Sequence, residues 1–199
     1  MSILENIHGH ADLAALTPDE DAALCREIRK FLIENVSRTG GHLASNLGAV
    51  ELTVAIEKVF DVTRDRLVFD VGHQSYVHKL LTGRAGQFSS LRQLGGLSGF
   101  PKPCESDADA FIAGHASNAV SAALGMARAR TLKGEDHSVV ALLGDGALTG
   151  GLAYEGLNDA GESGEPLIII LNDNGMSISR NVGGIARHLA RIRLKSSYY

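Results

Sequence analysis

The sequence predicts an α/β fold with three layers, in which helices cover both faces of a mostly parallel sheet. Two continuous apolar stretches, residues 139–143 and 167–171, have the length and composition of core strands. A shorter stretch, residues 66–70, has the same character and runs into a glycine-containing turn. Residues 119–132 and 151–160 have the composition of helices. Strands that alternate with helices in this way pair in parallel through helical crossovers.

A long helix is predicted over residues 18–36. Thr17 and Glu20 have the spacing of a capping box, and Pro18 occupies the first helical position, where its missing N–H leaves no hydrogen bond unmade. Apolar residues then recur at helical spacing: Leu24, Ile28, Phe31 and Leu32. The glycine pair at residues 40–41 ends the helix.

A polar, glycine-flanked loop carrying His42, Ser45 and Asn46 follows, and it leads to a second helix. The apolar face of that helix is predicted to consist of Leu52, Ile56 and Val59. After the strand at residues 66–70, a turn over residues 71–74 precedes another helix around residues 75–81.

The glycine-rich stretch at residues 93–103 has no helical or strand periodicity. It nevertheless retains Leu97 and Phe100, which a flexible linker would not need. We therefore expect an ordered loop or lid.

Composition limits the classes of function. The 199 residues carry a formal net charge of -4, which leaves no broad basic surface for nucleic acid. No apolar run approaches the length of a membrane span, and the N-terminus lacks the pattern of an export signal. Cys25 and Cys104 are far apart and form neither a disulfide framework nor a zinc motif, so a cytoplasmic location is expected.

Polar clusters follow both core strands. Gly144-Asp145-Gly146 comes after residues 139–143, and residues 172–174 read Asn-Asp-Asn after the next strand. The separation fits one helical crossover, so both clusters should meet beyond the carboxyl ends of the sheet. A carboxylate from Asp145 and an asparagine amide suit a hard divalent cation, and the flanking glycines let backbone N–H groups approach a diphosphate.

Other interpretations of these clusters exist. Asp-Gly and Asn-Asp-Asn are each ordinary turn sequences when taken singly. A dinucleotide-binding site is a rival, because Gly144-x-Gly146 follows a strand, but position 149, where its third glycine belongs, is Thr149. No GxxxxGK[ST] motif is present, which excludes a P-loop.

Longer motifs give the sequence a family resemblance. These motifs are residues 39–48, 70–74, 95–101, 144–151 and 171–179. Through them the chain, from about Leu13 onward, resembles 1-deoxy-D-xylulose 5-phosphate synthase. Transketolase shares the shorter GDG signature but is less like these motifs. The resemblance implies a thiamine-diphosphate-binding fold, with thiamine diphosphate and Mg²⁺ as cofactors. It also implies the condensation of pyruvate with glyceraldehyde 3-phosphate, which releases carbon dioxide and serves isoprenoid precursor synthesis.

The resemblance assigns roles to individual residues. Asp145, Asn174 and the backbone carbonyl of Met176 become Mg²⁺ ligands. Residues expected to contact the cofactor in addition are Gly114, His115, Ala116, Gly144, Gly146 and Ala147. Family members usually have serine where this chain has Ala116, a departure that weakens a contact there, although Ser117 follows.

His42 and His73 match family histidines that face the substrate and the thiazolium ring, with His73 also contacting the cofactor. Ser45 is expected to hydrogen-bond pyruvate. The other histidines are expected to be structural or surface residues: His8, His10, His78, His137 and His188. The basic tail is predicted to form a helix with one solvated basic face, which includes Arg180, Arg187, Arg191, Arg193 and Lys195.

Residues 1–199 are expected to form a single diphosphate-binding domain that lacks the pyrimidine-binding and C-terminal domains of the family. Those domains carry the glutamate that activates the cofactor and the residues that bind substrate phosphate, so the chain is not expected to catalyse alone. Three interpretations stay open: a fragment of a longer synthase, favoured by the end at residues 196–199; a natural split subunit; and a non-catalytic binding protein. A homo-oligomer such as a dimer, or a complex with a separate pyrimidine-binding chain, is expected.

Overall fold

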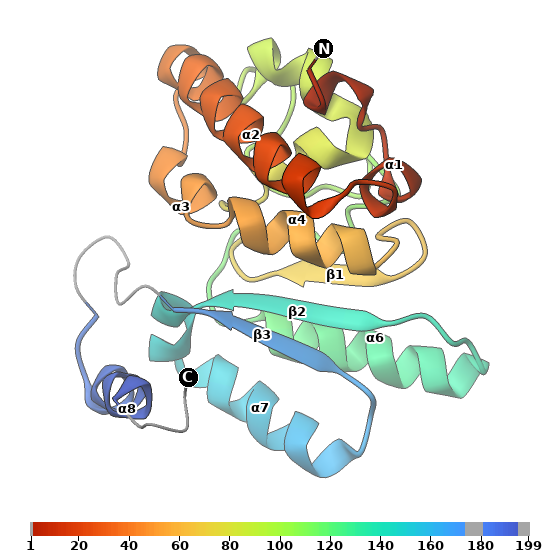
Figure 1. Ribbon diagram of the computed structural model, residues 1–199. Coiled ribbons are helices and arrows are strands. Elements are labelled where there is room, and N and C mark those ends of the chain that lie inside the picture. The colour runs from red at the N-terminus through yellow and green to blue at the C-terminus, as the bar shows by residue number, and fades with distance from the viewer. Residues whose placement is uncertain (1, 174–180, 195–199) are drawn as a thin grey trace.

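The computed structural model describes residues 2–173 and 181–194. Within them, a parallel sheet is formed in the order β1 (Arg66–Phe69), β2 (Val139–Gly144) and β3 (Ile168–Asn172). Helix α4 (Val50–Val59) covers one face of the sheet, with α2 (Pro18–Thr39) outside it. Helices α6 (Ala119–Lys133) and α7 (Gly151–Ser163) cover the other face (Figure 1). The predicted three-layer α/β fold is confirmed.

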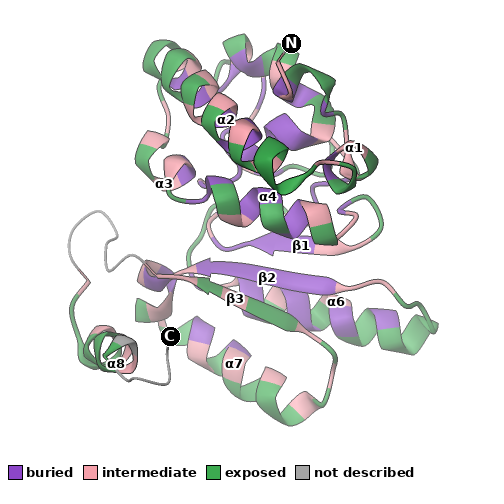
Figure 2. Cartoon of the chain, in the orientation of Figure 1, coloured by how far each residue is buried: buried purple, intermediate pink, exposed green. Residues whose placement is uncertain are grey.

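The alternating side chains of β1 and β2 divide the core between the two faces of the sheet. Leu67 and Leu142 pack with Ile56 of α4, whereas Val68 and Ala141 pack against the alanine-rich face of α6. This alternation is the two-residue period of a strand whose faces are both covered. Figure 2 shows the resulting burial of β1 and β2.

Strand β3 lies at the edge of the sheet and is more exposed than its apolar sequence indicates. Ile168, Ile169 and Leu171 keep 42%, 38% and 36% of their surface exposed. The strand begins one residue later than predicted and includes Asn172. Among the described residues nothing pairs with its outer side, because β2 is its partner and β1 lies beyond β2. Continuous apolar composition therefore predicted the strand but not its exposure.

Helix α2 begins with the predicted capping box. The Thr17 hydroxyl accepts a hydrogen bond from the backbone N–H of Glu20, whose carboxylate accepts one from the backbone N–H of Thr17. The helix continues three residues beyond the predicted end, because Gly40, with a φ of 75°, is the first residue that leaves helical geometry.

We expect Thr17→Ala to lower the free energy of unfolding by about 1 kcal/mol, because the first turn loses a side-chain acceptor for its N–H groups. Chemical denaturation measures the change. Ser37→Ala is the control: this hydroxyl lies in the last turns of the same helix and contacts only the Glu34 carbonyl within the described residues. Equal losses in both variants would contradict a specific role of the cap.

The remaining elements are short. The loop predicted around residues 42–46 was wrong in part, because it contains the short helix α3 (Leu43–Leu47), whereas α4 is the predicted second helix. Ile56 is buried on the apolar face of α4, as predicted. Val59, the last residue of α4, is 70% exposed, so the prediction that it belongs to this face was wrong. The other elements are η1 (Leu4–Asn6), α1 (His10–Ala14), α5 (Tyr76–Lys79), η2 (Leu80–Arg84), η3 (Ala85–Ser90), η4 (Asp145–Thr149) and α8 (Gly184–Arg193).

Further sequence predictions are confirmed in this part of the chain. Cys25 and Cys104 are free thiols, and residues 93–103 form an ordered loop without helix or strand. Helix α8 exposes Arg187 and Arg191 as predicted, whereas Arg180 and Lys195 of the predicted basic face lie outside the described residues. No helix within residues 2–173 and 181–194 is long and apolar enough to cross a bilayer.

Candidate functional site

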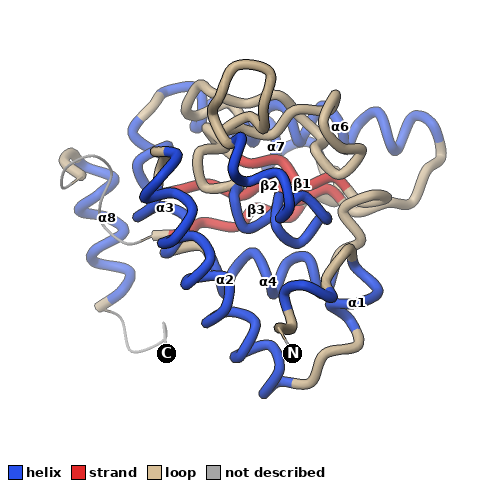
Figure 3. The backbone as a smooth tube through the Cα atoms, turned by 90° about the horizontal axis from the view of Figure 1, so that it is seen from above, coloured by secondary structure: helices blue, strands red, loops and turns tan. Residues whose placement is uncertain are grey.

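An aspartate directly follows each strand of the sheet. Asp70 follows β1, Asp145 follows β2, and Asp173 follows β3. Because the strands are parallel, with Gly144 paired to Asn172, all three aspartates lie at the same edge. Figures 1 and 3 show this edge on the side where α3 and α8 lie. Ligands of open α/β sheets bind at such carboxyl ends.

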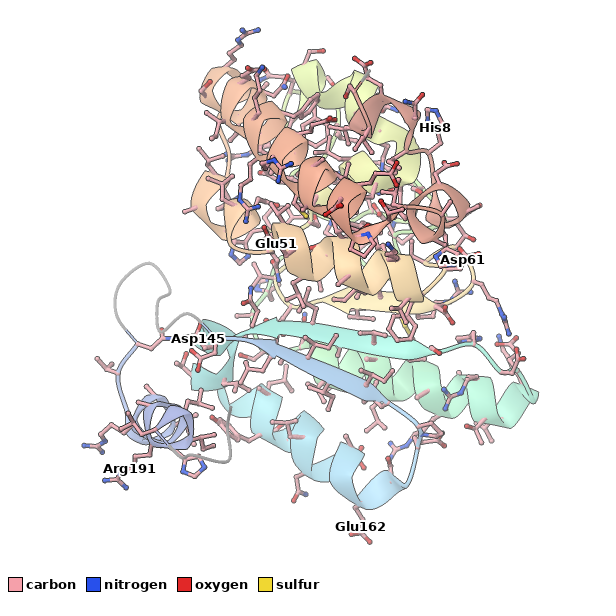
Figure 4. The ribbon with its side chains drawn as sticks, viewed as in Figure 1. His8, Glu51, Asp61, Asp145, Glu162 and Arg191 are labelled. Carbon is pink, nitrogen blue, oxygen red and sulfur yellow. The ribbon has the colours of Figure 1, made fainter. Side chains whose placement is uncertain are left out.

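Asp145 is buried at this edge and borders a hollow. Only 5% of its surface is exposed, and its carboxylate accepts a hydrogen bond of 2.7 Å from the Asn181 side chain. Figure 4 shows Asp145 at the end of the sheet, on the side of α8. A hollow of about 540 Å³ adjoins it, and its lining includes Asp145, Thr149, Asp173, Asn181, Ile185 and Arg187.

The helix predicted from residue 151 is confirmed as α7, and a short helix that was not predicted precedes it. This short 3-10 helix, η4, begins at Asp145, and α7 begins at Gly151. The GDG segment therefore does not lead directly into an α-helix as a dinucleotide-binding turn does. Gly146 and Ala147 lie in η4, at the edge where the diphosphate was predicted.

Two of the predicted metal ligands, Asn174 and Met176, lie outside the described residues. Within the described ranges, no group of three or more His, Cys, Asp or Glu side chains is placed to hold a metal ion. Asp145 fits as one ligand of a site that amide, carbonyl and phosphate oxygens complete, which is the oxygen-rich environment that Mg²⁺ prefers. Metal binding stays a prediction.

Asp70, which the sequence analysis did not single out, fixes the loop beside Asp145. Its two carboxylate oxygens accept hydrogen bonds from the backbone N–H groups of Ser117 and Ala119, at 2.8 and 3.0 Å. The Ser117 hydroxyl then donates to the Ala147 carbonyl at 2.7 Å. The hydrogen bonds thus run from the end of β1 to η4.

This arrangement places the remaining predicted cofactor contacts at the surface of the same edge. A Cβ added to Gly150 would lie 2.1 Å from the Ser117 hydroxyl, so the close approach of the two loops requires glycine there. The neighbouring segment leaves its side chains accessible to a ligand; its exposed residues are Gly114, His115 and Ala116.

His42 and His73 meet at the other side of this edge. Their rings are 5.3 Å apart between centroids, in an edge-to-face arrangement. His73 follows a turn in which Val71 and Gly72 both have positive φ, 60° and 83°. A positive φ is unfavourable for a β-branched residue such as Val71, so the surrounding structure must hold this turn.

The environment of both imidazoles favours their neutral forms. Burial lowers the pKa of His73, and the neighbouring His42 lowers it further. Burial and the positive charge of Arg92 lower the pKa of His42. At neutral pH both rings can therefore accept a proton. The Nδ1 atom of His73 is buried and has no hydrogen-bond partner within the described residues, which leaves it available to a bound group.

Ser45 lies in α3, whose N-cap residue is His42, where the sequence analysis expected a loop. Its hydroxyl donates to the backbone carbonyl of His42 at 3.2 Å. This contact supports the first turn of α3, and substrate binding by Ser45 stays a prediction.

Asn46 joins the two histidine segments and was named in the sequence only as a loop residue. Its amide donates to the carbonyl of His42 at 2.7 Å and to that of His73 at 2.8 Å. Its oxygen accepts the backbone N–H of Tyr76 at 2.8 Å. Asn46 is fully buried, so no water replaces these bonds.

We expect Asn46→Asp to lower the free energy of unfolding by about 2 kcal/mol, because a carboxylate cannot donate to the two carbonyls. Thermal and chemical denaturation measure the loss. Asn35→Asp makes the same change where the amide donates to the Phe31 carbonyl in α2 on a half-exposed surface, and a loss below about 1 kcal/mol is expected. Similar losses at both sites would rule out a special role of Asn46.

The structure is similar to transketolase from Leishmania mexicana, with a TM-score of 0.66 over 82% of this chain and 29% of that chain, at 24% sequence identity. The fold is therefore that of the transketolase-like α/β proteins.

The sequence identifies the family within that class. The family model described as 1-deoxy-D-xylulose-5-phosphate synthase matches residues 4–199. The enzyme of that name from Clostridium kluyveri is 60% identical over 197 residues, 99% of this chain and 32% of the relative. That from Desulforudis audaxviator is 58% identical, over 100% of this chain and 31% of the relative. The chain belongs to the 1-deoxy-D-xylulose-5-phosphate synthase family and spans about a third of the length of these curated relatives.

Proposed function

We propose that this chain is the diphosphate-binding part of a synthase that condenses pyruvate with glyceraldehyde 3-phosphate to form 1-deoxy-D-xylulose 5-phosphate and carbon dioxide. The observation that carries the proposal is a chain of hydrogen bonds along the carboxyl ends of the strands. Asp70, which precedes the His73 turn, is connected through Ser117 to the η4 segment that contains Asp145. A diphosphate site and a proton-transfer site are thereby held in one framework.

The proposed cofactors are thiamine diphosphate and Mg²⁺. Asp145, Asn174 and the carbonyl of Met176 would hold the metal, and backbone N–H groups of Gly146 and Ala147 would bind the diphosphate. Arg187, which lines the hollow beside Asp145, adds a positive charge suited to phosphate. When bound, thiamine diphosphate supplies the electron sink for decarboxylation of a 2-oxo acid.

The residues around the histidine pair would position the substrate and move protons. The buried Nδ1 of His73 is placed to accept a hydrogen bond or a proton from a bound group. His42 lies beside it with a lowered pKa, so it also serves as a proton acceptor. The charge of Arg92 acts on His42 and suits an anionic substrate such as pyruvate. Ser45 would add a hydrogen bond to pyruvate.

The complete site would require residues beyond this chain. Support comes from the length of the relatives and from β3, whose apolar residues are exposed at the sheet edge. We propose that another part of the protein, or a separate pyrimidine-binding chain, covers the exposed side of β3. We also propose that the assembly works as a dimer or higher oligomer in the cytoplasm.

A complementation experiment tests this function. The chain is mixed with a second chain that contains the remaining two thirds of the Clostridium kluyveri relative, together with thiamine diphosphate, Mg²⁺ and both substrates. Release of labelled carbon dioxide from pyruvate, and formation of the five-carbon product, are expected only when both chains are present. Cofactor binding without turnover in a stable complex of the two chains would contradict the proposed reaction and favour a non-catalytic binding role.

A further inference from the structure

Six charged side chains form a buried network beside the histidine pair. These residues, called here the ionic network, come from α4, α5, η2 and the loop that follows residue 93; they are Glu57, His78, Lys79, Arg84, Glu105 and Asp109. The Glu105 side chain is 17% exposed, and the other side chains are at most 5% exposed. His78 was expected to be a structural or surface residue, and it lies at the centre of this network.

The network pairs each carboxylate with a cation. Both ring nitrogens of His78 face carboxylates, Nδ1 at 2.6 Å from Glu57 and Nε2 at 2.9 Å from Asp109. Arg84 donates two hydrogen bonds of 2.8 Å to Asp109, and Lys79 lies 2.6 Å from Glu105. Burial opposes a charge on His78, but the Glu57 carboxylate and the hydrogen bond to Asp109 outweigh it and raise its pKa. With His78 protonated, three carboxylates face three cations, but burial raises the pKa of Glu57 and lowers that of Lys79 and so opposes the charge on each.

The network also holds both ends of a short loop segment, residues 98–102. Glu105 accepts the backbone N–H of Ser98 at 2.8 Å, and its other oxygen is paired with Lys79. Asp109 accepts the backbone N–H of Lys102 at 2.7 Å. Each end of the segment is thus bonded to a carboxylate that buried cations fix in place.

The middle of this segment lies against the candidate site. The Phe100 ring is 6.2 Å from the His42 ring between centroids. Pro101 packs on the turn that precedes His73 so closely that a Cβ added to Gly72 would lie 2.6 Å from its Cδ. The position of residues 98–102 therefore affects the surroundings of the His42 ring and of the turn that precedes His73.

We propose that the ionic network acts as a positioning clamp. In it, Glu105 and Asp109 hold residues 98–102 so that Phe100 lies beside the His42 ring and Pro101 packs on the turn that precedes His73. The inference rests on the proposed function in one point only, namely that His42 and His73 take part in catalysis. Buried ion pairs often contribute no more stability than apolar packing, because removing charges from water costs as much as their attraction returns. Their directional bonds to the Ser98 and Lys102 amides supply the positional specificity that apolar packing lacks.

Amide hydrogen exchange in the 199-residue chain tests the clamp. Glu105→Gln keeps the shape of the side chain but removes its charge, and exchange at Ser98 is expected to rise about tenfold. Asp109→Asn should have the same effect at Lys102. Exchange at Leu142 of β2 reports global stability and should change much less. His42 is an exposed residue with the Phe100 ring on one side, so the rate at which diethylpyrocarbonate modifies it should rise further as Phe100 moves away.

Asp159→Asn provides the matched control, since it weakens an exposed carboxylate–arginine pair far along the sequence, between Asp159 and Arg128. It should leave exchange at Ser98 and modification of His42 unchanged. The proposal is overturned if Glu105→Gln leaves both readouts at wild-type values. An equal rise in exchange at Ser98 and Leu142, with His42 modified at the wild-type rate, also overturns it, because the network is then only structural. None of these readouts requires cofactor, so failure of the proposed function would be seen separately.

Discussion

Asp109→Ala is expected to lower the free energy of unfolding by about 3–5 kcal/mol, because it leaves buried positive charges without their partner. Asp109 is 2% exposed and pairs with His78 and with both terminal nitrogens of Arg84. Burial alone would raise its pKa, but hydrogen bonds from His78 and Arg84 outweigh that effect and hold the pKa well below its usual range. The carboxylate is therefore charged throughout the physiological range.

The same chemical pair on the surface provides a control for this prediction. Arg128 donates two hydrogen bonds to Asp159, of 3.0 and 2.7 Å, but the two side chains are 46% and 53% exposed. Asp159→Ala should cost at most about 1 kcal/mol. Urea denaturation of both variants measures the difference, and equal losses would show that burial does not control the contribution of the network.

Asp145→Ala is expected to lower magnesium-dependent affinity for thiamine diphosphate at least about 100-fold, because the metal loses its carboxylate ligand. At a ligand concentration of about 100 times Kd, binding stabilises the native chain by about 2.7 kcal/mol, and the variant should retain about 0.4 kcal/mol. Thermal denaturation with and without cofactor and Mg²⁺ reports both values.

The control for Asp145 is Asp136→Ala. The Asp136 side chain is 87% exposed and lies in the loop before β2, at the opposite end of the strand. It should keep the full stabilisation by cofactor. Full stabilisation in Asp145→Ala as well would remove this carboxylate from the metal site.

Local patterns in the sequence predicted the local parts of the fold. The capping box of Thr17 and Glu20 and the apolar strand before Asp145 each depend on neighbours along the chain, and the structure contains both. The exposure of β3 depends on its place at the sheet edge, which its composition does not encode. Val59 likewise fits the helical period but falls at the exposed end of α4.

Site residues within glycine-rich, charged motifs could be predicted from the sequence. Residues whose role depends on contacts between distant segments could not. His42 and His73 were predicted separately, and the structure places their rings side by side. Asn46 and Asp70 were missed because the contacts that join separate segments, from Asn46 to His73 and from Asp70 to Ala119, span 27 and 49 residues. Asp70 had one usable indication, since it follows a strand in the same way as Asp145. The ionic network had none, because its members share no spacing or motif.

Calorimetric titration of thiamine diphosphate into the unmodified chain, with and without Mg²⁺, tests the central claim most directly. Saturable binding at one site per chain that requires Mg²⁺ is the expected result, because the diphosphate is held mainly through the metal at Asp145. Absence of binding in the presence of Mg²⁺, by a chain that remains folded, would contradict the diphosphate-binding function proposed for this edge of the sheet.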